Sequence, residues 1–335
     1  MSTATNDQDK SVCSTSVIAA GYLGPSLVPN QDAAWDEAGL PHNPDDLVQK
    51  MMGQPMRRAG RFIKLVCCGA LTCLRSAPEE VLSGKKVGIF LATGLGNIDE
   101  ILPFITQVFK HDGGFPSPNQ FANSVSNAAA FFLARVCDVK GVVLTISQEE
   151  LSFESTLWLA QSYLESRDID LALVGGCDVF TPSVEDYRER MDLKPDNARS
   201  MPMGEGSSWL LLGGPGEAAI GRMVSVTLDD RGKAPQDLST PQYIISQCDS
   251  AAAFEQETKP QQRILLPGFR LTRSDDPLFA AKGWNVEDYL PHCGISPTAA
   301  AYGIARALLS RRAALCVHYN YHTSGRQALV TVTTE

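Results

Sequence analysis

The sequence lacks any dense block of lysine and arginine, and its basic residues do not alternate with aromatic ones. It has 29 Lys and Arg against 38 Asp and Glu, which gives a formal net charge of −9. Proteins that bind nucleic acid rely on clustered basic side chains to neutralise phosphates. The charge pattern therefore excludes nucleic acid from the expected partners of the chain.

The sequence also lacks paired cysteines with CxxC spacing, although it has nine cysteines in total. Without paired spacing, neither a zinc site nor a disulfide framework is indicated. Three of the cysteines lie in one apolar, helix-like run, where burial explains them better than ligation of a metal. We expect reduced thiols packed in the core, at positions 13, 67, 68, 73, 137, 177, 248, 293 and 316.

No run of 18 uncharged apolar residues occurs, and no basic segment leads into an apolar one near the N-terminus. A membrane-spanning helix needs a longer apolar run, and a secretory signal needs that basic-to-apolar order. We therefore expect no membrane association and a cytoplasmic location.

Complete phosphate-binding loops are missing as well. The triplets Gly94-Leu-Gly and Gly204-Glu-Gly extend to neither GxGxxG nor GxxxxGK[ST], so we interpret them as sites of close backbone packing. No GxSxG motif is present, and Ser152 falls inside an expected helix, which argues against a hydrolase triad. The residues give no sign of a metal or a diffusible cofactor.

What the sequence does have is an alternation of apolar strands and helices. A strand at 141–146, a helix at 149–166 and a strand at 170–175 form a βαβ unit, which implies parallel pairing and a right-handed crossover. The 44% of apolar residues is ample for a core. Further helices are expected at 57–76, 97–110, 123–136 and 296–310, and further strands at 17–24, 86–93, 204–213, 263–267, 313–319 and 328–333.

The chain divides by composition into three parts. Residues 1–15 are rich in Ser, Thr, Asn and Asp and are expected to be disordered. Residues 225–262 are polar and interrupted by proline, as is typical of a connection between two halves of one fold. We therefore expect an N-terminal half at 16–225 and a C-terminal half at 226–335.

Four segments, in this order and at this spacing, resemble the β-ketoacyl synthases of the thiolase-like fold. They are Pro116-Ser-Pro-Asn-Gln-Phe-Ala-Asn-Ser-Val-Ser-Asn-Ala-Ala-Ala, Ser147-Gln-Glu-Glu-Leu-Ser-Phe, Leu173-Val-Gly-Gly-Cys-Asp and Met203-Gly-Glu-Gly-Ser-Ser-Trp-Leu-Leu-Leu. The second segment is similar to the acidic sequence that chain-length-factor subunits of bacterial type II, polyene-type ketosynthases carry at the nucleophile turn. The resemblance implies a layered αβαβα thiolase-like α/β fold of two related halves, with a shortened C-terminal half.

The resemblance places the nucleophile position of a ketosynthase at or near Glu150, and no cysteine lies in that window. A thiolate at a helix N-terminus is activated by the helix dipole, whereas a glutamate cannot form the thioester intermediate that condensation requires. An alternative is that Glu149 and Glu150 simply cap the first turn of their helix. Covalent thioester chemistry at this turn is absent in both interpretations.

The other positions that the resemblance assigns to catalysis are mostly changed. The loop that carries the first histidine of the family corresponds to 267–276, which has none, and the lysine would fall near Glu287 or Asp288. His292 is the one catalytic-type residue that the resemblance retains, and it can also be an ordinary structural histidine. The glycine-rich oxyanion loop corresponds to 319–325, where Tyr321 and His322 are bulky.

The resemblance therefore implies a non-condensing subunit, a pseudoenzyme, that pairs as a heterodimer with an active ketosynthase in fatty acid, polyketide or polyene biosynthesis. Residues 119–135 and 141–146 would contact that partner. An acyl carrier protein is the second expected partner, and its phosphopantetheine arm is the only prosthetic group implied. The best candidates for a basic patch that would receive the acidic carrier are Arg57, Arg58, Arg61 and Lys64.

Two enzymatic alternatives remain open at this point. The chain could act as an acyltransferase or decarboxylase on carrier-bound acyl groups through Glu150 and His292, provided that both reach one substrate carbonyl. Alternatively, Cys177 or Cys293 could have taken over as the nucleophile, since both lie beside segments that carry the resemblance. Buried cysteines are usually inert, which weighs against the second alternative.

Overall fold

The computed structural model describes residues 15–110, 117–181, 202–230, 232–253, 262–271 and 275–335. The expected disordered segment 1–15 therefore lies outside the described residues except for its last position, which begins the first strand. Among the residues described, no helix is long and apolar enough to cross a membrane.

Ten strands form one continuous sheet in the order β3-β2-β4-β5-β1-β6-β10-β9-β7-β8. Counted outward from the centre of the sheet, the strands of the first half are β1, β5, β4, β2 and β3. Those of the second half are β6, β10, β9, β7 and β8, which is the same order within that half. Both halves also have the same directions, since β2 pairs in parallel with β3 and β4, and β7 with β8 and β9. The strands are β1 (Thr15–Leu23), β2 (Val87–Ala92), β3 (Val143–Ile146), β4 (Leu171–Asp178), β5 (Gly206–Gly213), β6 (Gly221–Asp229), β7 (Arg263–Pro267), β8 (Asn285–Val286), β9 (Ala314–Tyr321) and β10 (Gln327–Thr334).

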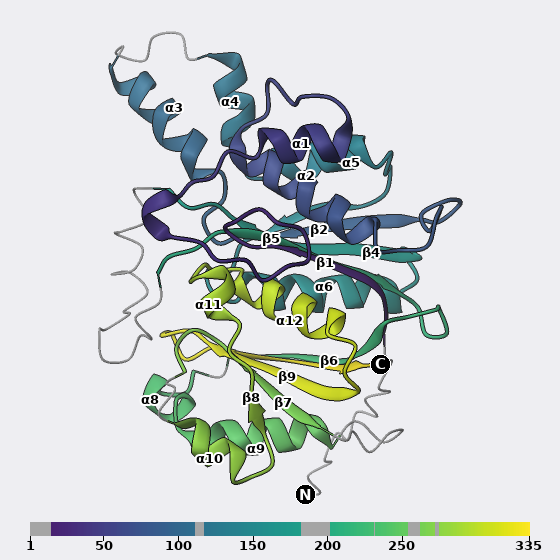
Figure 1. The fold of residues 1–335 in the computed structure, drawn as a ribbon, viewed down its shortest axis with the longest axis vertical. Helices are drawn as coiled ribbons and strands as arrows, with labels where there is room; N and C mark the ends of the chain where they lie inside the picture. The colour runs from purple at the N-terminus through teal and green to yellow at the C-terminus, as the bar shows by residue number, and fades with distance from the viewer. Residues whose placement is uncertain (1–14, 111–116, 182–201, 231, 254–261, 272–274) are drawn as a thin grey trace, which may run out of the picture.

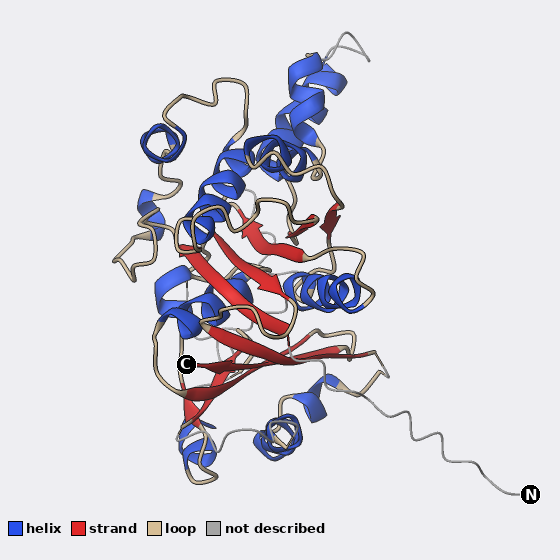
Figure 2. Ribbon diagram, turned by 90° about the vertical axis from the view of Figure 1, so that its right-hand side faces the viewer, coloured by secondary structure: helices blue, strands red, loops and turns tan. Residues whose placement is uncertain are grey.

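The helices complete five layers (Figure 1). Helices α6 (Ser152–Glu165) and α12 (Ala299–Leu309) pack between the two halves of the sheet. The outer face of the first half is covered by α2 and α5, and that of the second half by α8, α9 and α10, as the turned view in Figure 2 also shows. Bounds of the other helices are α1 (Asp45–Met52), α2 (Arg61–Leu74), α3 (Ile98–Lys110), α4 (Pro118–Ser124), α5 (Ala128–Val136), α8 (Pro235–Leu238), α9 (Pro241–Ala252), α10 (Asp276–Ala280) and α11 (Leu290–Cys293), with a 3-10 turn at Glu37–Gly39.

This arrangement is the thiolase-like layered α/β fold that the resemblance implies, with two related halves of which the second is shorter. Helix α12 is apolar on nearly all sides, and its residues Ala299, Ala300, Ala301 and Gly303 are all buried. A helix that is apolar all round belongs in the interior, and its small residues allow close packing. A Cβ on Gly303, for example, would come within 2.5 Å of the Tyr289 ring.

Most of the predicted elements are present near their expected positions, but one predicted helix is divided. The single helix expected at 123–136 is two helices, α4 and α5, because Val125 is extended with φ −85° and ψ 131°. The side chain of Ser117 caps α4 and Pro118 occupies its first turn, so this helix has its own start. The Ser/Asn-rich residues between the two helices favour a turn there.

The connection expected at 225–262 also holds regular structure, since it contains the end of β6 and the helices α8 and α9. The boundary expected between residues 225 and 226 falls inside β6. Strand β6 pairs with β1 at its start and with β10 along its length, and it is the first strand of the second half.

The two glycine triplets occupy positions of close backbone approach, which confirms their interpretation as packing sites. A Cβ on Gly94 would lie 2.2 Å from the Pro297 ring, and a Cβ on Gly204 would lie 1.8 Å from the carbonyl oxygen of Cys293. The contact of Gly94 holds the residues just before α12 against the first half of the fold, and the contact of Gly204 holds the end of α11 there. These glycines therefore help to fix the region around the turn before α6.

Candidate functional site

The turn between β3 and α6 is tightly built. The backbone N–H of Gln148 donates to Ser152 Oγ at 2.9 Å, and the Leu151 N–H donates to the Gln148 carbonyl at 3.1 Å. Glu149 has φ +53°, a left-handed conformation that is unfavourable for a residue other than glycine. The helix expected from residue 149 therefore begins at Ser152, and the two glutamates belong to the turn.

The carboxylates of Glu149 and Glu150 have different surroundings. The side chain of Glu149 is 60% exposed, whereas that of Glu150 is 4% exposed. A buried carboxylate is costly unless charged or polar groups compensate it. Neither glutamate side chain makes a hydrogen bond to the first backbone N–H groups of α6, so helix capping is not what places them here.

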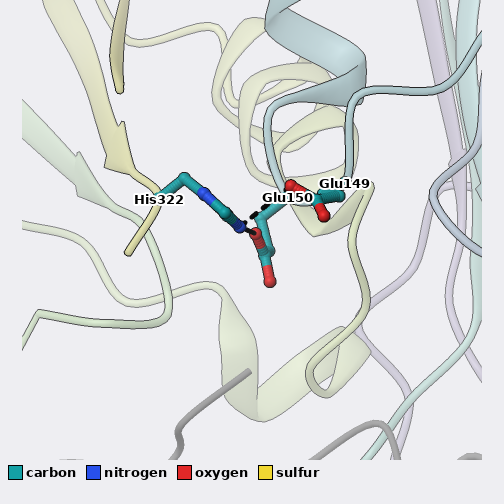
Figure 3. Close-up of side chains that lie close together, drawn as sticks. All are labelled: Glu149, Glu150 and His322. Carbon is teal, nitrogen blue, oxygen red and sulfur yellow. Dashed lines mark ion pairs between the residues drawn. The ribbon is translucent and has the colours of Figure 1, made fainter. Parts of the chain in front are cut away.

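Three segments that are distant in sequence meet at Glu150. Oε1 of Glu150 lies 3.5 Å from Nη2 of Arg270, a buried guanidinium from the segment that follows β7. Its Oε2 lies 3.0 Å from Nε2 of His322, which follows β9 in the β9–β10 hairpin. Figure 3 shows the same imidazole nitrogen facing Glu149 as well, at 2.9 Å from Oε2. Arg326, also from the hairpin, completes the cluster by donating to Glu149 Oε2 at 2.8 Å.

The hydrogen bonds of His322 identify its tautomer. The backbone N–H of Ser324 donates to Nδ1 at 3.1 Å, so Nδ1 carries a lone pair and the ring proton is on Nε2. One N–H can point at only one of the two carboxylates beside it. Oε2 of Glu150 accordingly has no hydrogen-bond partner despite its 3.0 Å contact with the ring. That contact is electrostatic, and the atom can still accept a hydrogen bond.

Glu149, Glu150 and His322 bring three possible ligand atoms within 4.8 Å of one another, a grouping compatible with a metal ion. The surrounding charges argue against this interpretation. The guanidinium groups of Arg270 and Arg326 already balance the two carboxylates. A metal would also need the lone pair of Nε2, which the Ser324 hydrogen bond assigns to Nδ1 instead. The cluster is better described as an ion-pair network than as a metal site.

A second acidic residue, Glu154, lies one helical turn beyond Glu150 and is completely buried. Its Oε1 is 2.9 Å from Nε2 of His318, while Nδ1 of the same ring faces the Leu266 carbonyl at 3.0 Å. Both ring nitrogens thus face oxygen acceptors, so His318 and Glu154 share a proton between them. Asn320 donates to Glu154 Oε1 at 3.0 Å and to the Glu150 carbonyl at 2.9 Å, and so ties the turn to β9.

His292, the histidine that the sequence retains in a catalytic position, has a different partner. Its Nε2 lies 3.8 Å from Oδ2 of Asp32, and its side chain is 34% exposed. Burial alone would raise the pKa of Asp32, but hydrogen bonds from Arg306 and Tyr302 outweigh it and hold that pKa below the usual value. The charged partner of Glu150 is Arg270, and the imidazole beside its carboxylate is that of His322, so the histidine at this site is not the one that the resemblance retains.

The basic patch expected for an acidic partner is smaller than the sequence predicts. Arg61 pairs with the buried Glu205, and Lys64 pairs with Asp45 at 2.7 Å. Arg57 and Arg58 are exposed. Two of the four expected charges are therefore neutralised within the chain.

The cysteines that the structure describes are free, and all but Cys137 are buried, which confirms the expected core thiols at those buried positions. Cys137 is only partly buried, and Cys13 lies outside the described residues. Burial raises the pKa of Cys177 and of Cys293 well above the usual value for a thiol. Because the thiolate is the nucleophilic form, neither residue fits the role of a relocated nucleophile.

We expect iodoacetamide at pH 8 to leave Cys177 and Cys293 unmodified in the native protein under conditions that modify both in urea, because the native thiols are buried and protonated. Mass spectrometry of tryptic peptides measures this directly. Rapid modification of Cys293 in the native protein would revive the alternative of a relocated nucleophile.

Sequence reasoning missed Arg270, Glu154, His318 and Asn320, although signals for some of them were present. In the helix that the sequence predicts from residue 149, Glu154 would lie on the same face as Glu150, four residues earlier. His318 and Asn320 alternate along β9, so their side chains lie on the same face of the sheet. No local pattern joins Arg270 to Glu150, because 120 residues separate them.

Comparison with solved structures identifies the fold. No protein-family model matches the chain, and no curated protein matches it by sequence. Solved structures do match. The ishigamide ketosynthase/chain length factor aligns with a TM-score of 0.72 and 16% identity, over 96% of this chain and 99% of that one. A β-ketoacyl synthase from Burkholderia phymatum STM815 aligns with a TM-score of 0.71 and 13% identity, over 96% and 100%.

A third match is a type II PKS acyl-carrier protein in complex with its ketosynthase bound to the hexaketide, AntDE:AntF, with a TM-score of 0.69 and 11% identity. The alignment covers 96% of this chain and all of the matched one. Identities this low establish the fold alone. The chain has the thiolase-like fold of the β-ketoacyl synthases and of the ketosynthase/chain length factor.

Proposed function

We propose that the chain is a non-condensing, ketosynthase-like subunit that pairs with an active ketosynthase, in the manner of a chain-length factor. The observation that carries the proposal is the buried glutamate at the turn before α6. Its carboxylate lies against Arg270 and His322, at the position where the resemblance expects a nucleophilic cysteine. Without a thiol there, the chain has no group at this turn for holding an acyl chain as a thioester.

The expected contact surface for the partner, residues 119–135 and 141–146, corresponds to α4, α5 and β3. Strand β3 forms one edge of the sheet, and an edge strand can pair with a strand of another chain. The neighbouring helices expose large apolar side chains, as is typical of surfaces that a partner covers. On α4, α5 and the adjoining residues these are Phe121, Val125, Phe131 and Val136, and on α3 they are Leu102, Ile105 and Phe109.

The proposal extends to an acyl carrier protein as the second partner, with its phosphopantetheine arm as the only prosthetic group. The exposed Arg57 and Arg58 are the remaining basic candidates for its docking. A carrier protein is found with a ketosynthase in the AntDE:AntF complex, one of the matched structures.

Co-expression with intact ketosynthases of the same genome tests the proposal. We expect a stable heterodimer in size-exclusion chromatography with light scattering, and condensing activity only when the ketosynthase is present. A well-behaved homodimer that condenses acyl groups by itself would overturn the proposal. An adjacent gene for an intact ketosynthase would identify the first partner to try.

A second candidate function is decarboxylation or acyl transfer on a carrier-bound substrate without a covalent intermediate. The 3.0 Å contact between Glu150 and His322 favours it, since a carboxylate beside an imidazole can exchange protons with a substrate. In this candidate function, His322 would act with Glu150 in place of His292.

Incubation with a malonyl-carrier protein tests this second candidate. Decarboxylation would release carbon dioxide and leave an acetyl group on the carrier after uptake of one proton. We expect no release above the rate of the carrier alone, because Arg270 holds Glu150 and the Nε2–H of His322 faces two carboxylates. Release that His322→Ala abolishes and His292→Ala preserves would establish the second candidate instead.

A further inference from the structure

Helices α3 and α4 form an arm that projects beyond the outer helical layer of the first half of the fold (Figure 1). Within the described part of the chain, α3 packs mainly against α4, and none of its residues is buried. A helix with so few buried contacts depends on its base for its position on the body of the protein. Residues 97–100, where α3 begins, form this base. We call α3 and α4 the arm.

A buried ion pair lies beside the base of the arm. Arg61, the first residue of α2, pairs with Glu205, the residue before β5, and the side chain of Glu205 is fully buried. Nη2 of Arg61 also donates to the carbonyl of His42 at 2.9 Å. The backbone N–H of Phe180 donates to Oε2 of Glu205 at 3.0 Å. One cation and one neutral donor therefore hold the Glu205 carboxylate in the interior.

The same guanidinium has a second acidic neighbour, Asp99, at the base of the arm. Burial raises the pKa of Asp99 above its ordinary value, and the nearby charge of Arg61 lowers it only in part. Nη1 of Arg61 and Oδ1 of Asp99 are both buried, and neither has a hydrogen-bond partner among the described residues. A buried donor and a buried acceptor of opposite charge gain energy by pairing. Arg61 thus has one acidic partner in use and a second, unused one beside it.

The other titratable groups around this pair leave Asp99 as the second partner. Lys64 of α2 pairs with Asp45 at 2.7 Å. Burial and the neighbouring Asp99 raise the pKa of Glu100, and Lys64, not Arg61, is the cation that lowers it. The groups that face Glu205 from β4, α11 and α12 are neutral near pH 7, because burial raises their pKa; they are Cys177, Cys293 and Tyr302.

Glu205 changes its charge close to neutral pH. Burial raises its pKa from the ordinary value of 4.5 to about 7, although Arg61 and the Phe180 N–H lower it in part. A carboxyl group whose pKa is raised by folding stabilises the fold in its protonated form, and this stabilisation is lost as the pH rises through 7. Near pH 6 Glu205 is therefore mostly neutral, and Arg61 lacks its charged partner. Pairing with Arg61 would then favour the ionised form of Asp99.

We propose that Arg61 is a proton-controlled switch: it pairs with Glu205 while that carboxylate is ionised, and with Asp99 once Glu205 takes up a proton from the solvent. The second state ties α2 to the base of α3, so the arm is held more firmly near pH 6 than near pH 8. The inference goes beyond the proposed function, because it needs neither a ketosynthase partner nor the turn before α6. A chain that shows the switch and forms no complex with a ketosynthase would keep this inference and reject the partner proposal.

Hydrogen exchange of the arm at pH 6 and at pH 8, measured by mass spectrometry, tests the switch. After correction for the intrinsic effect of pH on exchange, peptides from α3 should be protected at least about fivefold more at pH 6, while peptides from α9 should not change. Glu205→Gln imitates the neutral side chain and should give the pH 6 protection at both pH values. Asp99→Asn should remove the additional protection at pH 6, because it leaves Arg61 without a second carboxylate.

Glu217→Gln is the matched control. Glu217 also pairs with a basic side chain, that of Lys85, but at an exposed site, so this variant should keep the pH dependence of the arm. Circular dichroism verifies folding. The comparison of the two pH values in the original protein needs no substitution, so equal protection of α3 at both would overturn the proposal even if a variant failed to fold. A pH dependence that persists in Glu205→Gln or in Asp99→Asn, or that disappears in the control, would overturn it as well.

Discussion

Replacing His318 by leucine should lower the free energy of unfolding by about 3–5 kcal/mol, because it leaves Glu154 buried without its charged partner. The side chains of both residues are almost fully inaccessible, at 1% and 0% exposure, and their contact is 2.9 Å long. Asn320 would remain as a donor to Glu154, but an amide does not compensate a buried charge. Urea unfolding of the variant and the original protein at pH 7 measures the difference.

The double variant His318→Leu/Glu154→Leu should recover most of that loss, since replacing a whole buried ion pair by apolar residues is often nearly neutral. His322→Leu is the matched control. It also removes a histidine beside a glutamate, but Glu150 keeps Arg270 and the ring is partly exposed. We expect this control to cost about 1 kcal/mol or less. A His318 variant no less stable than the His322 variant would contradict the assignment of the buried pair.

His318 and His322 therefore lie in two different parts of the region around the turn, one buried and one near the solvent. His318, Glu154 and Asn320 fasten α6 to β9 deep in the interior. Glu149, His322 and Arg326 lie nearer to the solvent, where Glu149 pairs with Arg326 and contacts the His322 ring. Neither part contains a cysteine that could carry an acyl group. This agrees with the proposed subunit, in which the turn has a structural role.

The individual strands and helices could be predicted because their signals are local, whereas the layered thiolase-like arrangement came from the resemblance. The βαβ unit around α6 depends on apolar runs and their spacing, and the strands β2, β4, β5 and β9 lie within a few residues of the expected positions. The helix break at Val125 was missed because Ala-rich residues on its C-terminal side carry a strong helix signal. Val125 is nonetheless extended, so α4, which begins after its Ser117 cap, ends before this residue, and α5 starts anew at Ala128.

The candidate site was less predictable, because its contacts join distant residues. Resemblance pointed to Glu150, and the structure shows it buried, but its partner Arg270 is 120 residues away. His322 was interpreted only as a bulky replacement for glycine, since nothing in the sequence shows that the hairpin turns its ring toward the glutamates. For His292 the opposite holds. The resemblance assigned it a catalytic position, but in the structure its ring contacts Asp32 and not Glu150.

Replacing Phe131 by glutamate should weaken association with the ketosynthase partner at least about 100-fold, because large aromatic residues at an interface contribute most of its binding energy. Phe131 is on α5 and is 56% exposed in the isolated chain. If the partner covers this surface, the glutamate would be buried there without a compensating charge. Sedimentation or calorimetric titration of the purified subunits measures the change.

Leu278→Glu provides the control for this prediction, because it places the same charge at an exposed apolar position, 48% exposed, on α10. Figure 1 shows α10 under the second half of the sheet, at the opposite end of the molecule from α4. Association should be unchanged in this variant. Equal weakening by both substitutions would indicate a non-specific effect of charge, and no weakening by either would place the interface away from α4, α5 and β3. Weaker association with Phe131→Glu alone would support pairing through this edge of the sheet. It would thus support the hypothesis that the chain lacks the nucleophile and depends on a partner to supply it.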